Sequence, residues 1–251
     1  MVKVESMLRI IIFTAMVVLA NFSAAEKITL ANGDWAPYLS KTLKHHGYMS
    51  HIVKEAFAEE GIEVEYVFLP WKRGFEDAKE GKYQGSLIWG YNDDRAQHFL
   101  FSDTVAELGT SLFHQKSQSI DWNKPDDLKE FRIGGVIGYA YGVEDLEKQG
   151  IIKIDRIGKD EGNYKKLAAG RLDIVLEDTE VGHETISRLG MTDQLTAHPK
   201  TLKPRKYSVI ISKNAPNAQK LVDAFNRGLK KLIDDGRYQK YVEASRRGEY
   251  K

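Results

Sequence analysis

The chain has 251 residues, 42% of them hydrophobic, and a mean hydropathy of −0.44, which is typical of a globular protein with one large domain or two lobes. It has 37 basic and 36 acidic residues, and setting aside Lys3, Arg9 and Glu5 with the first 25 residues leaves 35 of each. This balance gives no support to nucleic-acid binding or to a role at a membrane surface. The chain contains no cysteine, which excludes disulfides and a lipid-modified cysteine.

The first 25 residues have the pattern of an export signal. Two basic residues precede an apolar run of about eleven residues, and small residues follow it (Lys3, Arg9, 10–20, Ser23 and Ala25). The run is too short to span a bilayer comfortably, although a membrane anchor is the alternative. We therefore expect cleavage before Glu26 and a mature protein that is free in the periplasm and not lipidated. Met1 and Met7 could each be the start of translation.

Residues 26–103 alternate between strand and helix patterns. We predict strands over 27–31, 63–68 and 85–89, and helices over about 49–60 and 70–80. Gly61 and Gly81 end the two helices, and Pro70 opens the second. The β-α-β-α-β order is that of a parallel sheet with helices packed on it.

The alternation restarts after Asp103 and forms a second α/β unit. We predict a helical turn over 126–129, strands over 132–137, 151–154 and 172–176, and helices over 142–149, 164–169 and 179–189. A returning strand over 207–212, a long helix over about 216–235 and a shorter one over 238–245 complete the chain. Two α/β lobes predict a cleft, and binding sites in such sheets lie beyond the carboxyl ends of the strands.

Several short segments, in this order and spacing, resemble the family 3 extracellular solute-binding proteins, the periplasmic amino-acid receptors of ABC importers. They are DWAPY at 34–38, GKYQG at 81–85, Arg95 followed by FSD at 101–103, residues 127–134, LAAGRLD at 167–173, and the final long helix that Gly236 terminates. The resemblance runs from 27 to about 241. It implies the type II periplasmic-binding-protein fold: two lobes, each a mostly parallel sheet flanked by helices, joined by a hinge of two crossovers. Lobe 1 would comprise 26–107 plus 205–251, and lobe 2 would comprise 108–204.

The same resemblance implies a ligand site between the lobes. Trp35 corresponds to the aromatic residue that stacks on the ligand, and Trp71 to the residue that opens the second helix. Arg95 corresponds to the arginine that holds the ligand carboxylate, and Asp178 to the acid that takes the ammonium group. A guanidinium is a planar fork that matches a carboxylate, and tryptophan offers apolar area and a negative face.

Each of these residues also has a purely structural interpretation. Arg95 could be a solvated charge in the turn that follows the strand SLIW, and Asp178 could be the N-cap of the helix that starts at Thr179. Trp35 and Trp71 could belong to the core of a lobe. The further ligand-binding candidates are also open to packing explanations, and they are Trp89, Tyr91, Gly138 and Tyr139.

The site departs from the usual family pattern at two places. The turn before Arg95 is WGYNDD and lacks the usual serine and threonine hydroxyls, and the second lobe has Gly138 followed by Tyr139 where Gly-Thr or Gly-Ser is common. Backbone N–H groups near Gly138 could still receive an anion at a helix N-terminus. The aromatic character of the site argues against an ordinary polar amino acid.

We therefore expect a monomeric periplasmic receptor that captures a small amino acid-like or carboxylate solute for an ABC permease in the inner membrane. No catalytic residue, cofactor or nucleic acid is expected. No metal site is expected either, because His45, His46 and His51 lack further ligands at a recognisable spacing. Two alternatives remain. One is a dehydratase or lyase for a small organic acid, in which Glu177 and Asp178 beside His183 supply acid–base groups. The other is a ligand receptor for a membrane sensor.

Overall fold

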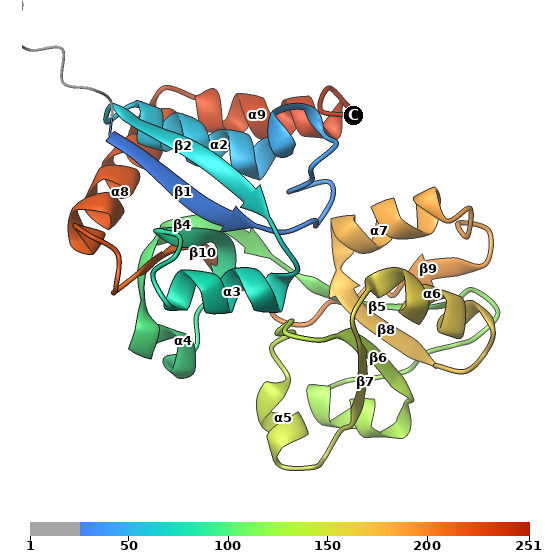
Figure 1. Cartoon of the computed structure of the whole chain (residues 1–251). Helices are drawn as coiled ribbons and strands as arrows, with labels where there is room; N and C mark the ends of the chain where they lie inside the picture. The colour runs from blue at the N-terminus through green and yellow to red at the C-terminus, as the bar shows by residue number, and fades with distance from the viewer. Residues whose placement is uncertain (1–25) are drawn as a thin grey trace, which may run out of the picture.

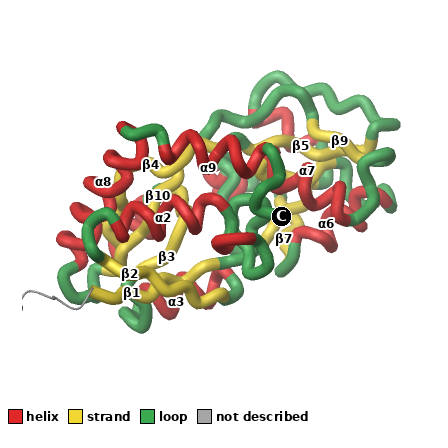
Figure 2. The backbone as a smooth tube through the Cα atoms, turned by 90° about the horizontal axis from the view of Figure 1, so that it is seen from above, coloured by secondary structure: helices red, strands yellow, loops and turns green. Residues whose placement is uncertain are grey.

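The computed structural model describes residues 26–251, so the expected export signal over 1–25 lies outside the described residues. Within the described part, none of the helices combines the length and the apolar character that crossing a bilayer requires. The chain forms two α/β units, which lie side by side in Figures 1 and 2.

The first unit is built on a five-stranded sheet. Its strands are β1 (Glu26–Asn32), β2 (Ile62–Phe68), β3 (Gly85–Gly90), β4 (Phe99–Leu108) and β10 (Arg205–Ser212), in the order β2-β1-β3-β10-β4. The strand β1 is parallel to both β2 and β3, whereas β10 is antiparallel to β3 and β4. The carboxyl end of β3 therefore lies beside the beginning of β10, with Gly90 opposite Tyr207.

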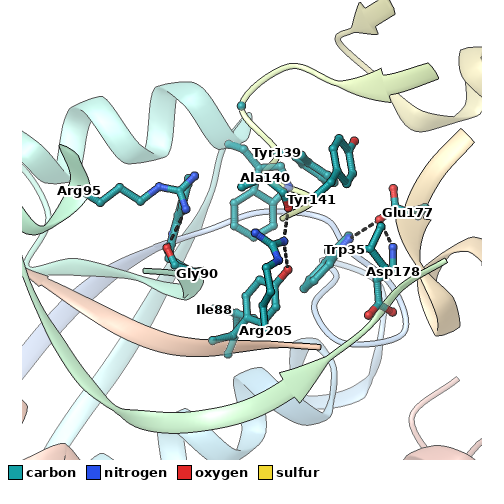
Figure 3. A pocket seen from close by; sticks show the side chains of 15 residues that line it. Trp35, Ile88, Gly90, Arg95, Tyr139, Ala140, Tyr141, Glu177, Asp178 and Arg205 are labelled. Atoms are coloured by element: carbon teal, nitrogen blue, oxygen red, sulfur yellow. Dashed lines mark hydrogen bonds between the residues drawn. The ribbon is translucent and has the colours of Figure 1, made fainter. Parts of the chain in front are cut away.

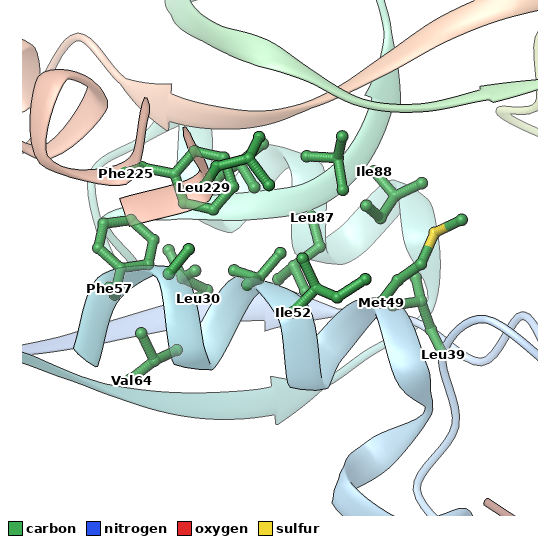
Figure 4. Close-up of a cluster of buried hydrophobic side chains, with 14 of the residues drawn as sticks. Leu30, Leu39, Met49, Ile52, Phe57, Val64, Leu87, Ile88, Phe225 and Leu229 are labelled. Carbon is green, nitrogen blue, oxygen red and sulfur yellow. The ribbon is translucent and has the colours of Figure 1, made fainter. Parts of the chain in front are cut away.

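Helices cover both faces of this sheet. They are α2 (Tyr48–Ala58), α3 (Trp71–Lys79), α4 (Asp93–His98), α8 (Ala218–Asp234) and α9 (Arg237–Arg246), with a short 3-10 turn η2 (Lys44–His46) before α2. α2, α8 and α9 lie on one face, and α3 and α4 lie on the other (Figure 1). The larger core lies between the sheet and the α2–α8 pair, where Phe57 and Phe225 approach to 5.2 Å between ring centroids (Figure 4).

The second unit is built on another five-stranded sheet, ordered β7-β6-β8-β5-β9. Its strands are β5 (Thr110–Gln115), β6 (Ile133–Val136), β7 (Ile154–Ile157), β8 (Ile174–Asp178) and β9 (Leu195–Ala197). β6 is parallel to β7 and β8, and β5 is antiparallel to β8 and β9. The helical elements are η3 (Pro125–Glu130), α5 (Glu144–Lys148), α6 (Asp160–Ala168) and α7 (Thr179–Arg188).

Two segments connect the units. The chain passes from β4 to β5 through Gly109, and it returns from β9 to β10 through residues 198–204. The architecture is therefore the two-lobed α/β fold that the sequence predicts. Each sheet combines parallel and antiparallel pairings, whereas mostly parallel sheets were expected, because β10 and β5 return to their sheets in the antiparallel direction. We refer to the unit that contains both ends of the described chain as the first lobe and to the other as the second lobe.

Two local predictions differ from the structure. The strand expected over 151–154 is β7 at Ile154–Ile157, because Gly150 has a positive φ and the N–H groups of Ile151 and Ile152 bond back to the carbonyl of Leu146. The turn expected around 90–95 is partly a helix, α4, because the side chain of Asn92 caps it at the backbone N–H of Arg95.

A close approach of two helices in the first lobe requires a glycine. A Cβ atom on Gly228 of α8 would overlap the carbonyl oxygen of Ala56 in α2.

We expect Gly228→Ala to lower the free energy of unfolding by about 1–3 kcal/mol or more, because backbone overlap outweighs the gain in helix propensity. Urea unfolding measures this. Gly158→Ala, where no atom lies within 4 Å of the added methyl group, is the control and should change little. Equal stability of the two variants would contradict the packing argument.

Candidate functional site

A cavity lies between the two lobes, and fifteen residues line it (Figure 3). The first lobe contributes Trp35, Trp71, Ile88, Trp89, Gly90, Arg95, Arg205 and Tyr207. The second lobe contributes Thr110, Gly138, Tyr139, Ala140, Tyr141, Glu177 and Asp178. The space open to the centre of a water molecule is about 50 Å³, several times what one water needs. The cavity therefore suits a small solute.

The site residues follow the carboxyl ends of strands. Trp35 follows β1, Trp71 follows β2, and Arg95 follows β3. In the second lobe, residues 138–141 follow β6 and Asp178 ends β8. Because the carboxyl ends of parallel strands meet at one edge of each sheet, the two edges face each other across the cavity.

Trp35 lies at the centre of an aromatic cluster. Its ring centroid is 5.0 Å from that of Tyr38, 6.3 Å from that of Tyr139 and 5.8 Å from that of Tyr207. Its side chain is buried, with 8% of its surface exposed. Trp35 therefore packs against both lobes, and the cluster joins them.

The two predicted indoles do not form parallel walls. Trp35 and Trp71 meet edge to face, with ring centroids 6.5 Å apart and an interplanar angle of 84°. Trp71 lies directly over the backbone of Gly33, where a Cβ atom would overlap its ring. In this arrangement the two indoles contact each other edge to face and form one continuous aromatic surface at the cavity.

Arg95 lies at the cavity, and its helix α4 positions it. Its Nη1 donates to the carbonyl of Gly90 at 2.7 Å, and its guanidinium carbon lies 4.8 Å from the ring centroid of Trp89. Burial, followed by the positive charge of Arg205, lowers the pKa of Arg95. No acidic side chain among residues 26–251 forms an ion pair with Arg95. The guanidinium therefore keeps N–H groups for another partner.

Two further predicted residues behave differently from each other. Trp89 lines the cavity and is buried, with its Nε1 donating to Ser86 Oγ at 2.8 Å. Tyr91 is 65% exposed and does not line the cavity, because its ring packs on Phe101 and its hydroxyl donates to Asp93. The structure thus places Tyr91 on the outer surface and not at the site.

The carboxyl group of Glu177 is buried between the lobes, with 1% of the residue exposed. Its Oε1 accepts from Trp35 Nε1 at 3.2 Å and from the backbone N–H of Asp178 at 2.9 Å. Its Oε2 is buried without a partner among the described residues. Burial raises the pKa of Glu177 to about 8, against its ordinary 4.5. The group is therefore mainly protonated at neutral pH.

Asp178 caps helix α7 and also bonds to the first lobe. Its Oδ1 accepts from the backbone N–H groups of Glu180 at 3.0 Å and Val181 at 3.3 Å, and from the hydroxyl of Tyr38 at 2.7 Å. Burial raises the pKa of Asp178 to about 6, and these hydrogen bonds oppose the shift. The N-cap interpretation of Asp178 is thus correct, and a ligand role would fall to Oδ2.

The backbone N–H groups directly before α5 are occupied by a carboxylate of the chain itself. Gly138 and Tyr139 line the cavity, but α5 begins only at Glu144. The carboxylate of Glu144 accepts from the backbone N–H of Tyr141 and, at 3.0 and 3.1 Å, from that of Gly142. The N–H groups of Tyr141 and Gly142 therefore bind an internal carboxylate, so an anion near Gly138 would not lie at a free helix N-terminus.

Arg205 and Tyr207 also line the cavity and were not predicted from the sequence. Arg205 Nη2 donates to the carbonyl of Ala140 and, at 2.6 Å, to the hydroxyl of Tyr207. The sequence offered one indication: Arg205 and Tyr207 are two residues apart at the start of a strand that follows the return segment between the lobes, so their side chains lie on the same face of that strand.

The side chains considered for acid–base chemistry and for metal binding are not brought together in the structure. His183 is exposed and packs on Phe113 at 5.4 Å, and it does not line the cavity with Glu177. His45 stacks on His51 at 4.0 Å, and His51 Nδ1 pairs with the hydroxyl of Tyr250. Across residues 26–251, no three ligand-type side chains are grouped to hold a metal ion.

Within residues 26–251, three hydrogen bonds and one ion pair connect the lobes. The bonds run from Trp35 to Glu177, from Tyr38 to Asp178 and from Arg205 to the carbonyl of Ala140. Lys251 Nζ adds an ion pair to Glu184 Oε2 at 3.0 Å. The two lobes therefore enclose an aromatic cavity and are joined across it by hydrogen bonds, which is the architecture of a binding protein that holds its ligand between two lobes.

The model of the bacterial extracellular solute-binding proteins, family 3, matches residues 28–244. The chain therefore belongs to this family. No curated protein matches the sequence.

Solved structures share the fold at low sequence identity. An amino acid ABC transporter substrate-binding protein, AbpA, from Streptococcus pneumoniae Canada MDR_19A, bound to L-arginine, is 18% identical with a TM-score of 0.73, covering 90% of this chain and 96% of that one. An ancestral arginine-binding protein bound to arginine is 18% identical with a TM-score of 0.72, covering 86% and 96%. A histidine kinase sensor domain similar to periplasmic binding proteins is also 18% identical, with a TM-score of 0.74, covering 90% and 96%.

The buried carboxyl of Glu177 predicts a pH-dependent stability. Between about pH 4.5 and 8 the folded protein retains a proton that the unfolded chain has lost, so the free energy of unfolding falls as pH rises through this window. Glu177→Gln keeps the shape and does not titrate. We expect its stability relative to the wild type to grow with pH, by about 1.4 kcal/mol per unit of pKa shift and a few kcal/mol in total.

Urea unfolding at acidic, neutral and alkaline pH measures this difference. Glu130→Gln is the matched control, because Glu130 is exposed on η3 and its variant should show a constant offset. A Glu177→Gln offset that stays constant across the pH range would mean that Glu177 is ionised in the folded protein.

Proposed function

We propose that this protein captures a small amino acid-like or carboxylate solute in the interlobe cavity and delivers it to an ABC permease of the inner membrane. The observation that carries the proposal is the Arg95 guanidinium, which lies at the cavity without an acidic partner among the described residues. A carboxylate is the group that its planar fork fits. The protein would act as a monomer in the periplasm, and the solute would hold the two lobes together.

The energetics allow a useful affinity. A charge-assisted hydrogen bond contributes about 1.5–3 kcal/mol, and micromolar binding requires about 8 kcal/mol. Two bonds from Arg95 with contact on Trp71 and Tyr139 supply that energy after ordering costs. The aromatic walls would hold the body of the solute.

Replacing Arg95 tests the assignment. We expect Arg95→Ala to weaken the binding of a carboxylate ligand about a hundredfold or more, because the ligand carboxylate is left unpaired in a closed cavity. A melting-temperature screen of amino acids and organic acids selects the ligand, and calorimetry then measures its dissociation constant. Arg73→Ala is the control: this arginine lies on the exposed side of α3, 66% exposed in its side chain, and does not line the cavity. Unchanged affinity in Arg95→Ala would reject the assignment.

A second function has a specific observation in its favour. The similarity to a histidine kinase sensor domain shows that this fold also serves in sensors. The captured solute would then be reported to a membrane sensor. Capture of membrane proteins by the immobilised protein, with and without ligand, distinguishes the two: a permease supports transport, and a sensor kinase supports signalling.

A further inference from the structure

Two guanidinium groups converge on one side of the cavity. The Nη1 atoms of Arg205 and Arg95 lie 3.7 and 3.9 Å from the position that a Cβ atom on Gly90 would take. The two nitrogens therefore lie no further apart than the sum of these distances. Figure 3 shows both groups beside the cavity, on elements of the first lobe. Gly90 leaves open the space between them.

The fold holds these like charges together without an acid to neutralise them. Across residues 26–251 neither arginine has an ion pair within 4 Å. Arg205 is fixed through Nη2, which bonds to Ala140 and Tyr207, while its Nε is buried without a partner. Arg95 is fixed through Nη1 and by the ring of Trp89. Both side chains are therefore oriented toward the cavity at an electrostatic cost.

The carboxyl groups around the cavity do not remove this positive charge. The carboxylate of Glu144 is the acid that acts on Arg95, and both of its oxygens are bound by backbone N–H groups. Asp178 uses Oδ1 in three hydrogen bonds on the other side of Trp35, and the buried Glu177 bonds to that indole. The charge at the Gly90 side is therefore left for a ligand.

We propose that the cavity selects a solute with two negative charges, a dicarboxylate or a phosphonate, held jointly by Arg95 and Arg205. A single carboxylate carries only one charge, and a second guanidinium beside it would remain partly uncompensated in a closed cavity. Two anionic charges match two guanidiniums, whose forks suit both carboxylate and phosphonate oxygens. The inference rests on the proposed function and specifies the class of its solute.

Matched probe pairs test the charge requirement. Calorimetry on the full mature protein, at mildly alkaline pH, compares glutamate with glutamine, succinate with succinamate, and phenylphosphonate with its monomethyl ester. Each pair differs by one negative charge and little in size. We expect the doubly anionic arm of at least one pair to bind tenfold or more tightly, and the pair that does so separates the dicarboxylate from the phosphonate. Equal affinity within every pair would overturn the proposal.

Substitution of Arg205 supplies the second test. Arg205→Gln should weaken binding of the doubly anionic probe tenfold or more and change its singly charged partner less than threefold. Lys206→Gln removes a charge from the exposed neighbour on the same strand and should change neither. A loss that is equal for both probes would show that Arg205 only positions Ala140, and would overturn the inference.

The two proposals fail in different ways. Singly charged probes that bind through Arg95, with no preference for a second charge, would leave the solute-binding function standing and reject the class of solute. If none of the six probes binds or shifts the melting temperature of the wild-type protein, the doubly anionic class of solute is rejected, and the wider screen of amino acids and organic acids then decides the solute-binding function. Melting curves of Arg205→Gln show whether that variant is folded, and the wild-type comparison stands without it.

Discussion

The hydrogen bond from the Trp35 indole to the Glu177 carboxyl is the contact on which the site depends. It joins residues 142 positions apart in sequence and one from each lobe. Because Glu177 is buried, it is mainly uncharged at neutral pH, so the lobes can meet there without burying an unpaired ion. The adjacent bond from Tyr38 to Asp178 adds a second connection. Together they bring the aromatic walls of both lobes around one cavity.

Much of the fold could be predicted from sequence, because strand and helix periodicities record which face of each element is buried. Periodicity indicated that the segments after the parallel strands lie at a cleft, and the family resemblance then pointed to Trp35, Trp71, Arg95 and Asp178, which all line the cavity. Tyr91 was misplaced because an exposed aromatic residue and a cavity-lining one give the same local signal. Arg205 could not be found this way. It begins an antiparallel strand, and only the pairing of β10 with β3 brings that beginning beside Gly90.

The family assignment and the site carry different information. Membership in family 3 rests on the match over 28–244, and the solved structures at 18% identity share the fold alone. The chemistry of this particular cavity comes from its own residues. The cavity has aromatic walls, the neutral Glu177 and two neighbouring guanidinium groups. These features differ from those of a site that binds a ligand with one carboxylate and one ammonium group.

The carboxylate of Glu144 occupies the backbone N–H groups that precede α5. In the second lobe the N–H groups of Tyr141 and Gly142 are thus already bound, while both arginines that line the cavity belong to the first lobe. An acidic solute arriving from solution would consequently dock on the half that contains both chain ends. Under the proposed function, the first lobe would therefore supply the electrostatic attraction, and the second lobe would supply enclosure and exclusion of water.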